Sequence, residues 1–418
     1  MRRVFIANRG EIALRIVNAC RQLELECVVG VSDVDRGGLA ASRADRAVCV
    51  GPGPPAQSYL RDDLIVQAAL GTGCDAIHPG YGFLSESPAL AARAREHGLT
   101  FVGPPPEVME LAGDKLRARQ EANRAGVPIL GDTGFPVLIK AVGGGGGRGI
   151  RLAHDEAELD SLLSLARSEA GAAFGDTRVY LERFIPAARH VEVQVAADQH
   201  GSVVHLGERD CSVQRRYQKV IEESPAPGLD DTTRAQLHDA GVTFARAIGY
   251  HNLGTVEFVL DVETGNFYFL EMNCRIQVEH PVTEAVTGLD LVAMQLRIAR
   301  GEPLRTAESR GHAIECRLNA GSPGTVTKFA VPDTVRVDTH CHPGAVIPPY
   351  YDSLMAKLIA HGEDRDEAID MLVNALEEVD VDGVDTNRPL LISILGHPDF
   401  RAGAVTTTWL EQARDRVR

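Results

Sequence analysis

Short apolar runs and segments of helical spacing alternate over the first hundred residues. Val4–Ala7 is an apolar run, and Gly10–Leu23 then carries apolar residues three or four positions apart, which predicts a strand followed by a helix. Further strands are expected at Cys27–Val31, Ala47–Val50, Asp75–Ile77 and Leu99–Val102, and helices at Asp62–Leu70 and Glu86–His97. Strands that alternate with helices pair in parallel, so this region predicts a doubly wound, Rossmann-like α/β domain.

A smaller unit with a different pattern follows a connector at 104–126, which we expect to be mostly helical. Its expected elements are a strand, a glycine run, a second strand, a helix and a third strand, at Pro136–Ala141, Gly143–Gly147, Ile150–Ala153, Asp155–Ala170 and Arg178–Glu182. This order predicts a small α+β lobe. A glycine run between two strands also suits a lid that closes over a ligand.

Hairpins dominate the chain from residue 190 onward. Strands are expected at His190–Ala197, Ser202–Gly207, Thr255–Asp261, Asn266–Met272 and His312–Leu318, and helices at Thr232–Ile248, Leu289–Arg300 and Arg365–Glu378. The turn signal Glu263-Thr264-Gly265-Asn266 joins two of these strands into a hairpin. We therefore predict three parts: a parallel-sheet domain at 1–112, a connector with the lid lobe at 113–189, and a mixed or antiparallel sheet domain at 190–418.

The composition is that of an ordinary globular protein. Hydrophobic residues make up 44% of the 418 residues and charged residues 24%, which excludes a mainly disordered chain. The net charge of -15 disfavours a nucleic-acid partner, and no apolar run reaches the roughly 18 residues that span a membrane. With no signal-peptide pattern and eight cysteines that form no C-x-x-C pair, we expect a cytoplasmic protein with reduced thiols.

The basic residues are unevenly divided between the two types. Of the 43, five are lysines, which leaves 38 arginines. Codon bias explains such a ratio, but a chain that nearly always uses arginine can keep lysine where a compact point charge is needed. Three of the five lysines, at positions 115, 140 and 219, fall inside the motifs described next.

The glycine run is the strongest local signal. Glycines bring backbone N–H groups close to an anion because no Cβ intervenes. A strand follows Gly143–Gly147, and Arg148 stands where a Walker A loop needs lysine, so neither a dinucleotide fingerprint nor a Walker A loop is predicted. With Lys140 just before it, the run is interpreted as a lid over phosphates, and a flexible solvent loop is the alternative.

Two glutamates and an asparagine form a candidate metal site. Glu257 and Glu271 fall nearly opposite each other on the predicted hairpin, and Asn273 shares a face with Glu271 because strands have a period of two. Facing carboxylates destabilise a strand pair unless a cation lies between them. Oxygen ligands of this kind suit Mg²⁺, so we predict a site for Mg²⁺ or Mn²⁺, with two exposed strand glutamates as the alternative.

Three further segments each leave two interpretations open. Strand alternation would place Arg275, Gln277 and Glu279 on one face, as an oxyanion site with a base or as a salt-bridged strand end. The charged segment Glu208–Lys219 is expected to be a loop, facing either phosphate or solvent. Arg317, on a predicted strand, would need a partner if it faced inward, or it could face water.

These segments together resemble biotin carboxylase, the ATP-grasp component of acetyl-CoA, propionyl-CoA and pyruvate carboxylases. The matching segments are Ile6–Arg15, His78–Glu86, Gly113–Lys115, Lys140 with the glycine run, Arg189–Glu192, Glu208–Lys219, Glu271–Thr283 and Pro348–Asp352. The resemblance implies an ATP-grasp fold. It also implies MgATP-dependent carboxylation of biotin by bicarbonate, through carboxyphosphate.

The resemblance assigns a role to each site residue. The ATP-binding residues would be Lys115, Lys140, Gly144, Gly145, Gly146, Gly147, Glu182, Ile185, His190 and Gln214. The metal ligands would be Glu257, Glu271 and Asn273. Lys219 would lie near the transferred phosphate, and bicarbonate would bind Arg275, Gln277 and the Val278 backbone. Glu279 would deprotonate bicarbonate, Arg317 would steady the enolate-like biotin, and Tyr81 with Gly82 would line the biotin pocket.

The resemblance also implies partners. No lysine lies in a Met-Lys-Met context, so we expect biotin on a separate biotin carboxyl carrier protein. We also expect a carboxyltransferase subunit and a homodimer. The chain departs from the family at Tyr217, where many members have histidine, and in the shortened segments 127–135 and 319–324. Another ATP-grasp carboxylate ligase and a catalytically impaired assembly paralogue are the alternatives.

Overall fold

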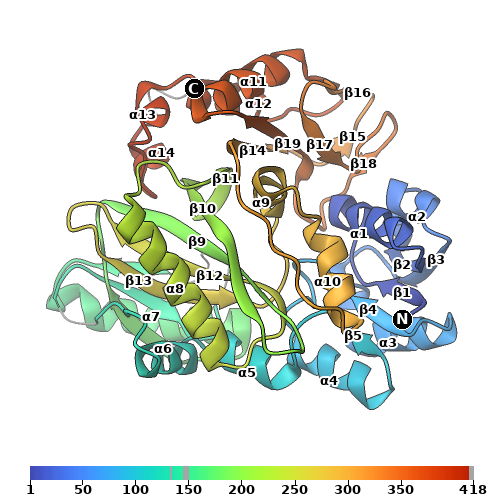
Figure 1. Cartoon of the computed structure of the whole chain (residues 1–418), viewed down its shortest axis with the longest axis horizontal. Coiled ribbons are helices and arrows are strands. Elements are labelled where there is room, and N and C mark those ends of the chain that lie inside the picture. The colour runs from blue at the N-terminus through green and yellow to red at the C-terminus, as the bar shows by residue number, and fades with distance from the viewer. Residues whose placement is uncertain (132–133, 145–149, 414–418) are drawn as a thin grey trace.

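The computed structural model describes residues 1–131, 134–144 and 150–413. Its first unit is a parallel sheet in the order β3-β2-β1-β4-β5 (Figure 1). The strands are β1 (Arg3–Ile6), β2 (Glu26–Ser32), β3 (Arg46–Gly51), β4 (Ala76–His78) and β5 (Thr100–Phe101). The helices are α1 (Gly10–Gln22), α2 (Leu39–Arg43), α3 (Asp62–Gly71) and α4 (Pro88–Glu96). The predicted doubly wound sheet is therefore confirmed.

The connector and the small lobe also form as the pattern predicts. Two helices, α5 (Pro106–Gly113) and α6 (Lys115–Arg124), make up the connector. The lobe is an antiparallel sheet in the order β7-β6-β8, with the helix α7 (Glu156–Phe174) packed on it. Its strands are β6 (Val137–Ala141), β7 (Arg151–Ala153) and β8 (Val179–Arg183). Gly145, Gly146 and Gly147 of the predicted lid loop lie outside the described residues.

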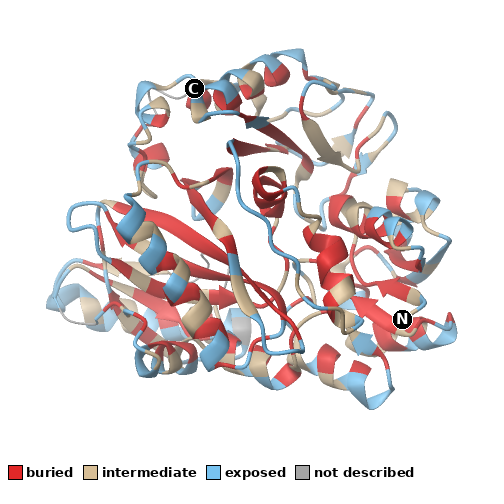
Figure 2. Cartoon of the chain, in the orientation of Figure 1, coloured by how far each residue is buried: buried red, intermediate tan, exposed pale blue. Residues whose placement is uncertain are grey.

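An eight-stranded antiparallel sheet forms the largest unit, in the order β13-β12-β9-β10-β11-β14-β19-β17. Its strands are β9 (Ala188–Ala197), β10 (Val203–Arg215), β11 (Gln218–Ser224), β12 (Asn252–Asp261), β13 (Phe267–Asn273), β14 (His312–Asn319), β17 (Arg336–Thr339) and β19 (Leu354–Gly362). Figure 2 shows most of its central strands as buried. Helix α8 (Asp231–Ala247) packs on β9 and β10 with its outer side exposed.

Helices and two short strand pairs complete the chain. The remaining helices are α9 (His280–Thr287), α10 (Leu291–Ala299), α11 (Arg365–Glu378), α12 (Arg388–Leu395), α13 (Pro398–Arg401) and α14 (Trp409–Gln412). The strand pairs are β15 (Gly324–Thr325) with β18 (Val346–Ile347), and β16 (Lys328–Ala330) with β20 (Asp380–Asp382). Helices α12 to α14 were not predicted from the sequence. Over the described ranges, the structure has no helix long and apolar enough to cross a membrane.

Two local predictions were wrong. The segment Glu208–Lys219 is not a loop: most of it belongs to β10 and β11, and only Arg216 and Tyr217 form the turn, both with positive φ. Its charges are tolerated in a buried strand because they are paired; Arg209, for example, bonds to Glu192 of β9. The segment 275–279 is conversely not a strand, because β13 ends at Asn273 and the chain turns into α9.

The C-terminal half of the large sheet has one polar and one apolar face. Cross-strand register puts Arg317, Lys357 and Asp338 on one face of β14, β19 and β17. The alternate residues Cys316 and Leu358 pack against α11 and α12 on the other face. A sheet buried on both sides usually carries apolar residues on both faces, so the polar face marks a place where charge is needed inside the protein.

Candidate active site

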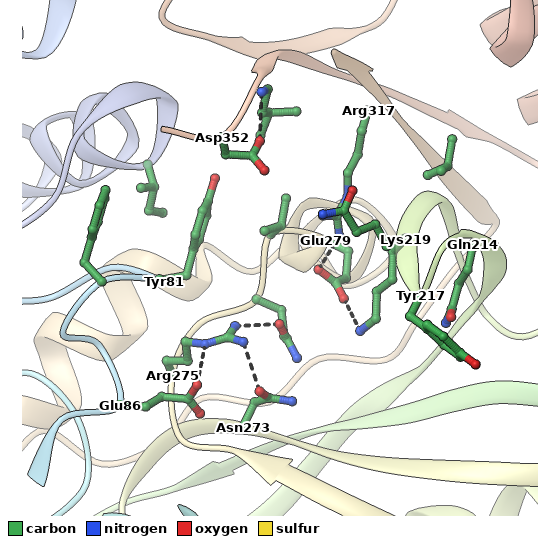
Figure 3. A pocket seen from close by; sticks show the side chains of 18 of the residues that line it. Tyr81, Glu86, Gln214, Tyr217, Lys219, Asn273, Arg275, Glu279, Arg317 and Asp352 are labelled. Atoms are coloured by element: carbon green, nitrogen blue, oxygen red, sulfur yellow. Dashed lines mark hydrogen bonds and ion pairs between the residues drawn. The ribbon is translucent and has the colours of Figure 1, made fainter. Parts of the chain in front are cut away.

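A cleft of about 1530 Å³ lies between the parallel sheet, the small lobe and the large sheet. Its walls include these predicted site residues: Tyr81, Gly82, Lys115, Lys140, Gly144, His190, Gln214, Lys219, Glu257, Glu271, Asn273, Arg275, Gln277, Val278, Glu279 and Arg317. The structure thus brings together candidates that lie far apart in the sequence (Figure 3). Glu182 and Ile185 do not line the cleft. Ile185 instead packs in a small apolar cluster beside it.

The ammonium of Lys219 is the centre of the charged network. Its Nζ lies 2.6 Å from a carboxylate oxygen of Glu192, 2.6 Å from one of Glu279 and 3.1 Å from one of Glu257. Burial opposes the charge, but the three carboxylates outweigh it and hold the pKa of Lys219 well above its ordinary value. Lys219 is therefore a fixed cation in the wall of the cleft.

Glu279 sits directly before α9, where the backbone turns from the loop into the helix. Its Oε1 accepts a hydrogen bond from Lys219, and its Oε2 accepts one of 3.0 Å from Arg317. Burial alone would raise the pKa of Glu279, but Lys219 and Arg317 lower it below the ordinary value. Glu279 is therefore ionised at neutral pH, as a side chain that accepts a proton must be.

The predicted metal ligands occupy the expected register. Glu257 and Glu271 are direct cross-strand partners on β12 and β13. Glu257 Oε1 accepts hydrogen bonds from Asn273 Nδ2 at 2.8 Å and from Gln277 Nε2 at 3.2 Å. Glu271 forms an ion pair of 2.7 Å with Lys115. Burial raises the pKa of Glu257, yet Lys219 and His190 lower it to about 2.

A second set of possible metal ligands overlaps the first. His190, Glu192 and Glu257 place three ligand atoms within 4.8 Å of one another. His190 Nε2 lies 3.3 Å from Glu257 and 3.5 Å from Glu192. Burial lowers the pKa of His190, but Glu257 raises it to about 9. With its imidazole protonated, His190 forms ion pairs with Glu257 and Glu192 in this structure.

Arg275 organises the loop that precedes α9. Its guanidinium donates to Glu86 at 3.1 Å, to Gln277 Oε1 at 2.6 Å and to Asn273 Oδ1 at 2.9 Å (Figure 3). Of the three residues predicted to share a face, Arg275 and Gln277 therefore meet through the reach of the arginine and not through strand alternation, while Glu279 bonds to Lys219 and Arg317 instead. The Gln277 amide N–H groups remain directed toward Glu257.

The lobe contributes Lys140 through an ion pair with Glu182, which is buried and also bonds to Arg119. The Glu182 carboxylate is therefore shared by two cations, and its ion pair with Lys140 helps to position Lys140 in the wall of the cleft. Gln214 at the far end of β10 donates to the Cys211 carbonyl oxygen.

Sequence reasoning gave no individual role to several buried charged residues that support the site. Glu192 and Arg209 are fully buried, and Arg209 Nε donates to Glu192 Oε1 at 2.6 Å. Glu222 pairs with Arg317 from the neighbouring strand. A usable signal existed for Glu192: it follows His190 by two residues in an otherwise apolar strand, which places both on one face.

Sequence models of three protein families match successive parts of the chain. "Biotin carboxylase, N-terminal domain" matches residues 1–109, "Carbamoyl-phosphate synthase L chain, ATP binding domain" residues 113–307, and "Biotin carboxylase C-terminal domain" residues 315–412. The biotin carboxylase of Pseudomonas aeruginosa is 48% identical, with 99% of this chain and 98% of that protein covered. Biotin carboxylase 1 of Bacillus subtilis is 46% identical, with 98% of each covered.

Solved structures are similar over the same length. A biotin carboxylase–β-γ-ATP complex from Campylobacter jejuni has a TM-score of 0.96 and 40% identity, covering 98% of both chains. The biotin carboxylase domain dimer of 2-oxoglutarate carboxylase from Hydrogenobacter thermophilus, in complex with MgADP, ADP and bicarbonate, also has a TM-score of 0.96. It is 42% identical and covers 100% of this chain and 98% of its own.

Proposed function

The chain belongs to the biotin carboxylase family, and we propose from that premise how its cleft carries out the reaction. The chain is an ATP-dependent biotin carboxylase, a ligase of the ATP-grasp family. The observation that carries the assignment of roles is Glu279, an ionised carboxylate held between Lys219 and Arg317. The proposed base, Glu279, therefore lies between Lys219, a cation suited to phosphate, and Arg317, a cation suited to an enolate oxygen.

The nucleotide end of the cleft is proposed to lie between the lobe and the large sheet. Lys115 and Lys140 would neutralise the phosphates, with Gly144, Gly145, Gly146 and Gly147 closing over them. The ribose would meet His190 and Gln214, which line the cleft, and the adenine would meet the segment that carries Glu182 and Ile185, whose side chains lie outside the cleft wall. The support is chemical: Lys115 and Lys140 both reach the cleft wall, and the Campylobacter jejuni relative was solved as a complex with β-γ-ATP.

The metal is proposed to bind Glu257, Glu271 and Asn273. These residues fit a hard cation because they offer two facing carboxylates and an amide oxygen. Mg²⁺, or Mn²⁺ in its place, would supply positive charge that neutralises the phosphates. In the structure Glu271 pairs with Lys115, and Asn273 Oδ1 accepts a hydrogen bond from Arg275, so both oxygen ligands already lie beside positive charge.

Bicarbonate is proposed to bind beside Glu279. Arg275, Gln277 and the backbone N–H of Val278 would hold its oxygens, and Glu279 would take its proton, leaving the oxyanion to attack the terminal phosphate of ATP. Lys219 would neutralise charge on the transferred phosphate. Carboxyphosphate formed in this way, with ADP as the leaving group, would break down to CO₂ and phosphate next to biotin. The protein's contribution is mainly orientation and charge neutralisation.

Biotin is proposed to enter along Tyr81 and Gly82 and to meet Arg317. Arg317 would stabilise the negative charge that develops on the ureido oxygen when the ring nitrogen loses its proton. We propose that biotin arrives on a separate biotin carboxyl carrier protein, because none of the five lysines of this sequence is flanked by methionines. Co-expression with a biotin ligase, followed by streptavidin blotting, should leave this chain unlabelled. A labelled band at its mass would contradict the proposal.

The oligomeric state, the partner subunit and the cellular compartment are also proposed. We propose a homodimer that works with a carboxyltransferase subunit in the cytoplasm. The Hydrogenobacter thermophilus relative was solved as a domain dimer. Buried thiols are consistent with a reducing compartment, since seven of the eight cysteines are buried and all eight are free.

A single assay tests the proposed function. Purified protein should hydrolyse ATP at a rate that depends on bicarbonate and rises when biotin is added. Carboxybiotin should form in the same mixture. ATP hydrolysis that does not respond to bicarbonate would instead favour another ATP-grasp ligase, and no hydrolysis at all would favour a catalytically impaired paralogue.

A further inference from the structure

Lys357 is a buried lysine that the assignment of roles leaves unused. It lies on the polar face of β19, opposite Arg317 on β14 and Asp338 on β17. Its side chain is fully buried. A buried ammonium is unfavourable unless it is paired and hydrogen-bonded. A lysine at this position, in a chain that has 38 arginines, therefore calls for a structural reason.

The ammonium of Lys357 contacts the loop that carries the proposed bicarbonate site. Nζ donates a hydrogen bond of 2.9 Å to the carbonyl oxygen of Val278. It also lies 3.2 Å from Glu11 Oε1 and 3.8 Å from Asp338 Oδ2. Burial lowers the pKa of Lys357, but Glu11, Glu315 and Asp338 outweigh it and raise the pKa above the ordinary value. Lys357 therefore keeps its charge and its donors at neutral pH.

The Val278 carbonyl belongs to the peptide that joins Val278 to Glu279. A hydrogen bond at that oxygen fixes the plane of the peptide, and with it the direction in which Glu279 leaves the backbone. Val278 and Glu279 lie in the turn before α9, which a backbone hydrogen bond of 3.4 Å from the His280 N–H to the Gln277 carbonyl oxygen closes, so no strand or helix pairing holds the Val278 carbonyl itself. Lys357 is the side chain that holds the Val278 carbonyl among the hydrogen bonds of the described residues.

The same ammonium connects this loop with the first domain. Glu11, in the first turn of α1, accepts a hydrogen bond from the hydroxyl of Tyr81. Burial raises the pKa of Glu11, and the charge of Lys357 opposes that rise. A continuous chain of contacts thus runs from Tyr81 through Glu11 and Lys357 to Val278. It joins the wall of the proposed biotin pocket to the proposed bicarbonate loop.

We propose that Lys357 is a positioning residue for the bicarbonate site: it holds the Val278–Glu279 peptide in place and, through Glu11, ties it to Tyr81. The inference rests on the proposed function. An ammonium suits this role because it is compact and can point separate donors at a carbonyl and at carboxylates, whereas a guanidinium is planar and larger. Lys357 does not line the cleft and would act only through its neighbours.

The test separates bicarbonate binding from ATP binding. In Lys357→Met the KM for bicarbonate should rise about 10- to 100-fold, the size typical of losing a hydrogen bond to a charged group. The KM for ATP should stay within about twofold, because Lys115, Lys140 and the proposed metal ligands are unchanged. Lys328→Met is the matched control: Lys328 is exposed and pairs only with Asp380 in the described part of the chain, so its kinetics should equal those of the wild type.

A second variant separates loss of positioning from loss of folding. Lys357→Met leaves Glu11 as a buried carboxylate without its cation, which is strongly destabilising. The double variant Glu11→Gln with Lys357→Met removes both charges and is expected to fold, since replacing a whole buried pair is often neutral. It should show the same selective rise in the KM for bicarbonate.

The outcomes distinguish failure of the proposed function from failure of the positioning role of Lys357. Wild-type protein without bicarbonate-dependent ATP cleavage would refute the proposed function itself. If the wild type is active and both variants bind bicarbonate normally, the positioning role is wrong. Equal rises in both KM values, or a double variant that does not fold, would assign Lys357 to general stability and likewise overturn the inference.

Discussion

Replacing Glu279 by glutamine is the sharpest test of the catalytic assignment. Glutamine keeps the shape of the side chain, but its single amide oxygen can replace only one of the two carboxylate oxygens that accept from Lys219 and Arg317. It cannot take a proton from bicarbonate. Loss of a general base typically costs about 10²- to 10⁴-fold in rate, which corresponds to about 3–5 kcal/mol of activation free energy. We therefore expect the bicarbonate-dependent kcat to fall by that factor.

The structure also predicts a modest effect on stability. Removing one partner of a buried ion pair usually costs about 3–5 kcal/mol because the other charge is left alone. Here neither cation is left alone: Lys219 keeps Glu192 and Glu257, and Arg317 keeps Glu222. The free energy of unfolding should consequently fall by less than that range. The KM for ATP should change by no more than about twofold.

Glu284→Gln is the matched control for this variant. Glu284 lies in α9, one helical turn and a half beyond Glu279, and its buried carboxylate bonds to Arg15 and Arg336 at 2.8 and 2.7 Å. It does not line the cleft. Steady-state ATP cleavage with varied bicarbonate, together with thermal melting, separates the two effects. Full activity in Glu279→Gln, or equal losses of activity in both variants, would refute Glu279 as the base.

Three further changes probe other parts of the cleft. Glu271→Gln removes a negative charge from the proposed metal ligands, so the KM for MgATP should rise about tenfold in assays at fixed free Mg²⁺; an unchanged KM would exclude Glu271 as a ligand. Arg317→Ala should reduce carboxylation of free biotin more than bicarbonate-dependent ATP cleavage, and equal losses would contradict its role. Burial raises the pKa of Glu222 from 4.5 to about 7, so the folded protein retains a proton that the unfolded chain releases. Relative to Glu222→Gln, the free energy of unfolding of the wild type should therefore fall by roughly 3 kcal/mol between pH 4.5 and 7. If the difference in melting temperature between the two proteins is the same at pH 5 and at pH 8, this prediction is wrong.

Local patterns were enough to predict the first sheet, the lobe and the hairpin that carries Glu257. In each case the determining interactions lie close in sequence. The turn at 263–265 brings β12 and β13 together over a short loop, and the period of two then places Glu257 opposite Glu271. The parallel sheet follows from strands and helices that succeed one another at regular spacing.

The charged segments could not be predicted in the same way because their partners are distant. Arg209 bonds to Glu192, Gln194 and Thr283, which lie 15 to 74 residues away. A run of charged residues suggests exposure unless those partners are known, so the pattern at Glu208–Lys219 predicts a loop where the chain forms strands. In the segment 275–279 the alternation of charged residues predicts a strand, but the chain forms none there. The Arg275 side chain instead donates a hydrogen bond back to Asn273.

The lysines show how a bias in amino-acid composition can point to a functional site. Lys115, Lys140 and Lys219 line the cleft, Lys357 holds the loop behind it, and only the fifth, Lys328, is exposed. Arginine serves equally well on a solvated surface, so a chain free to use it there keeps lysine mainly where the cavity accepts one small cation with separate donors. The sequence could show that lysine is scarce. It could not show that Lys357 belongs with the other three, because its partners Glu11 and Val278 come from two other segments that meet only in the folded protein.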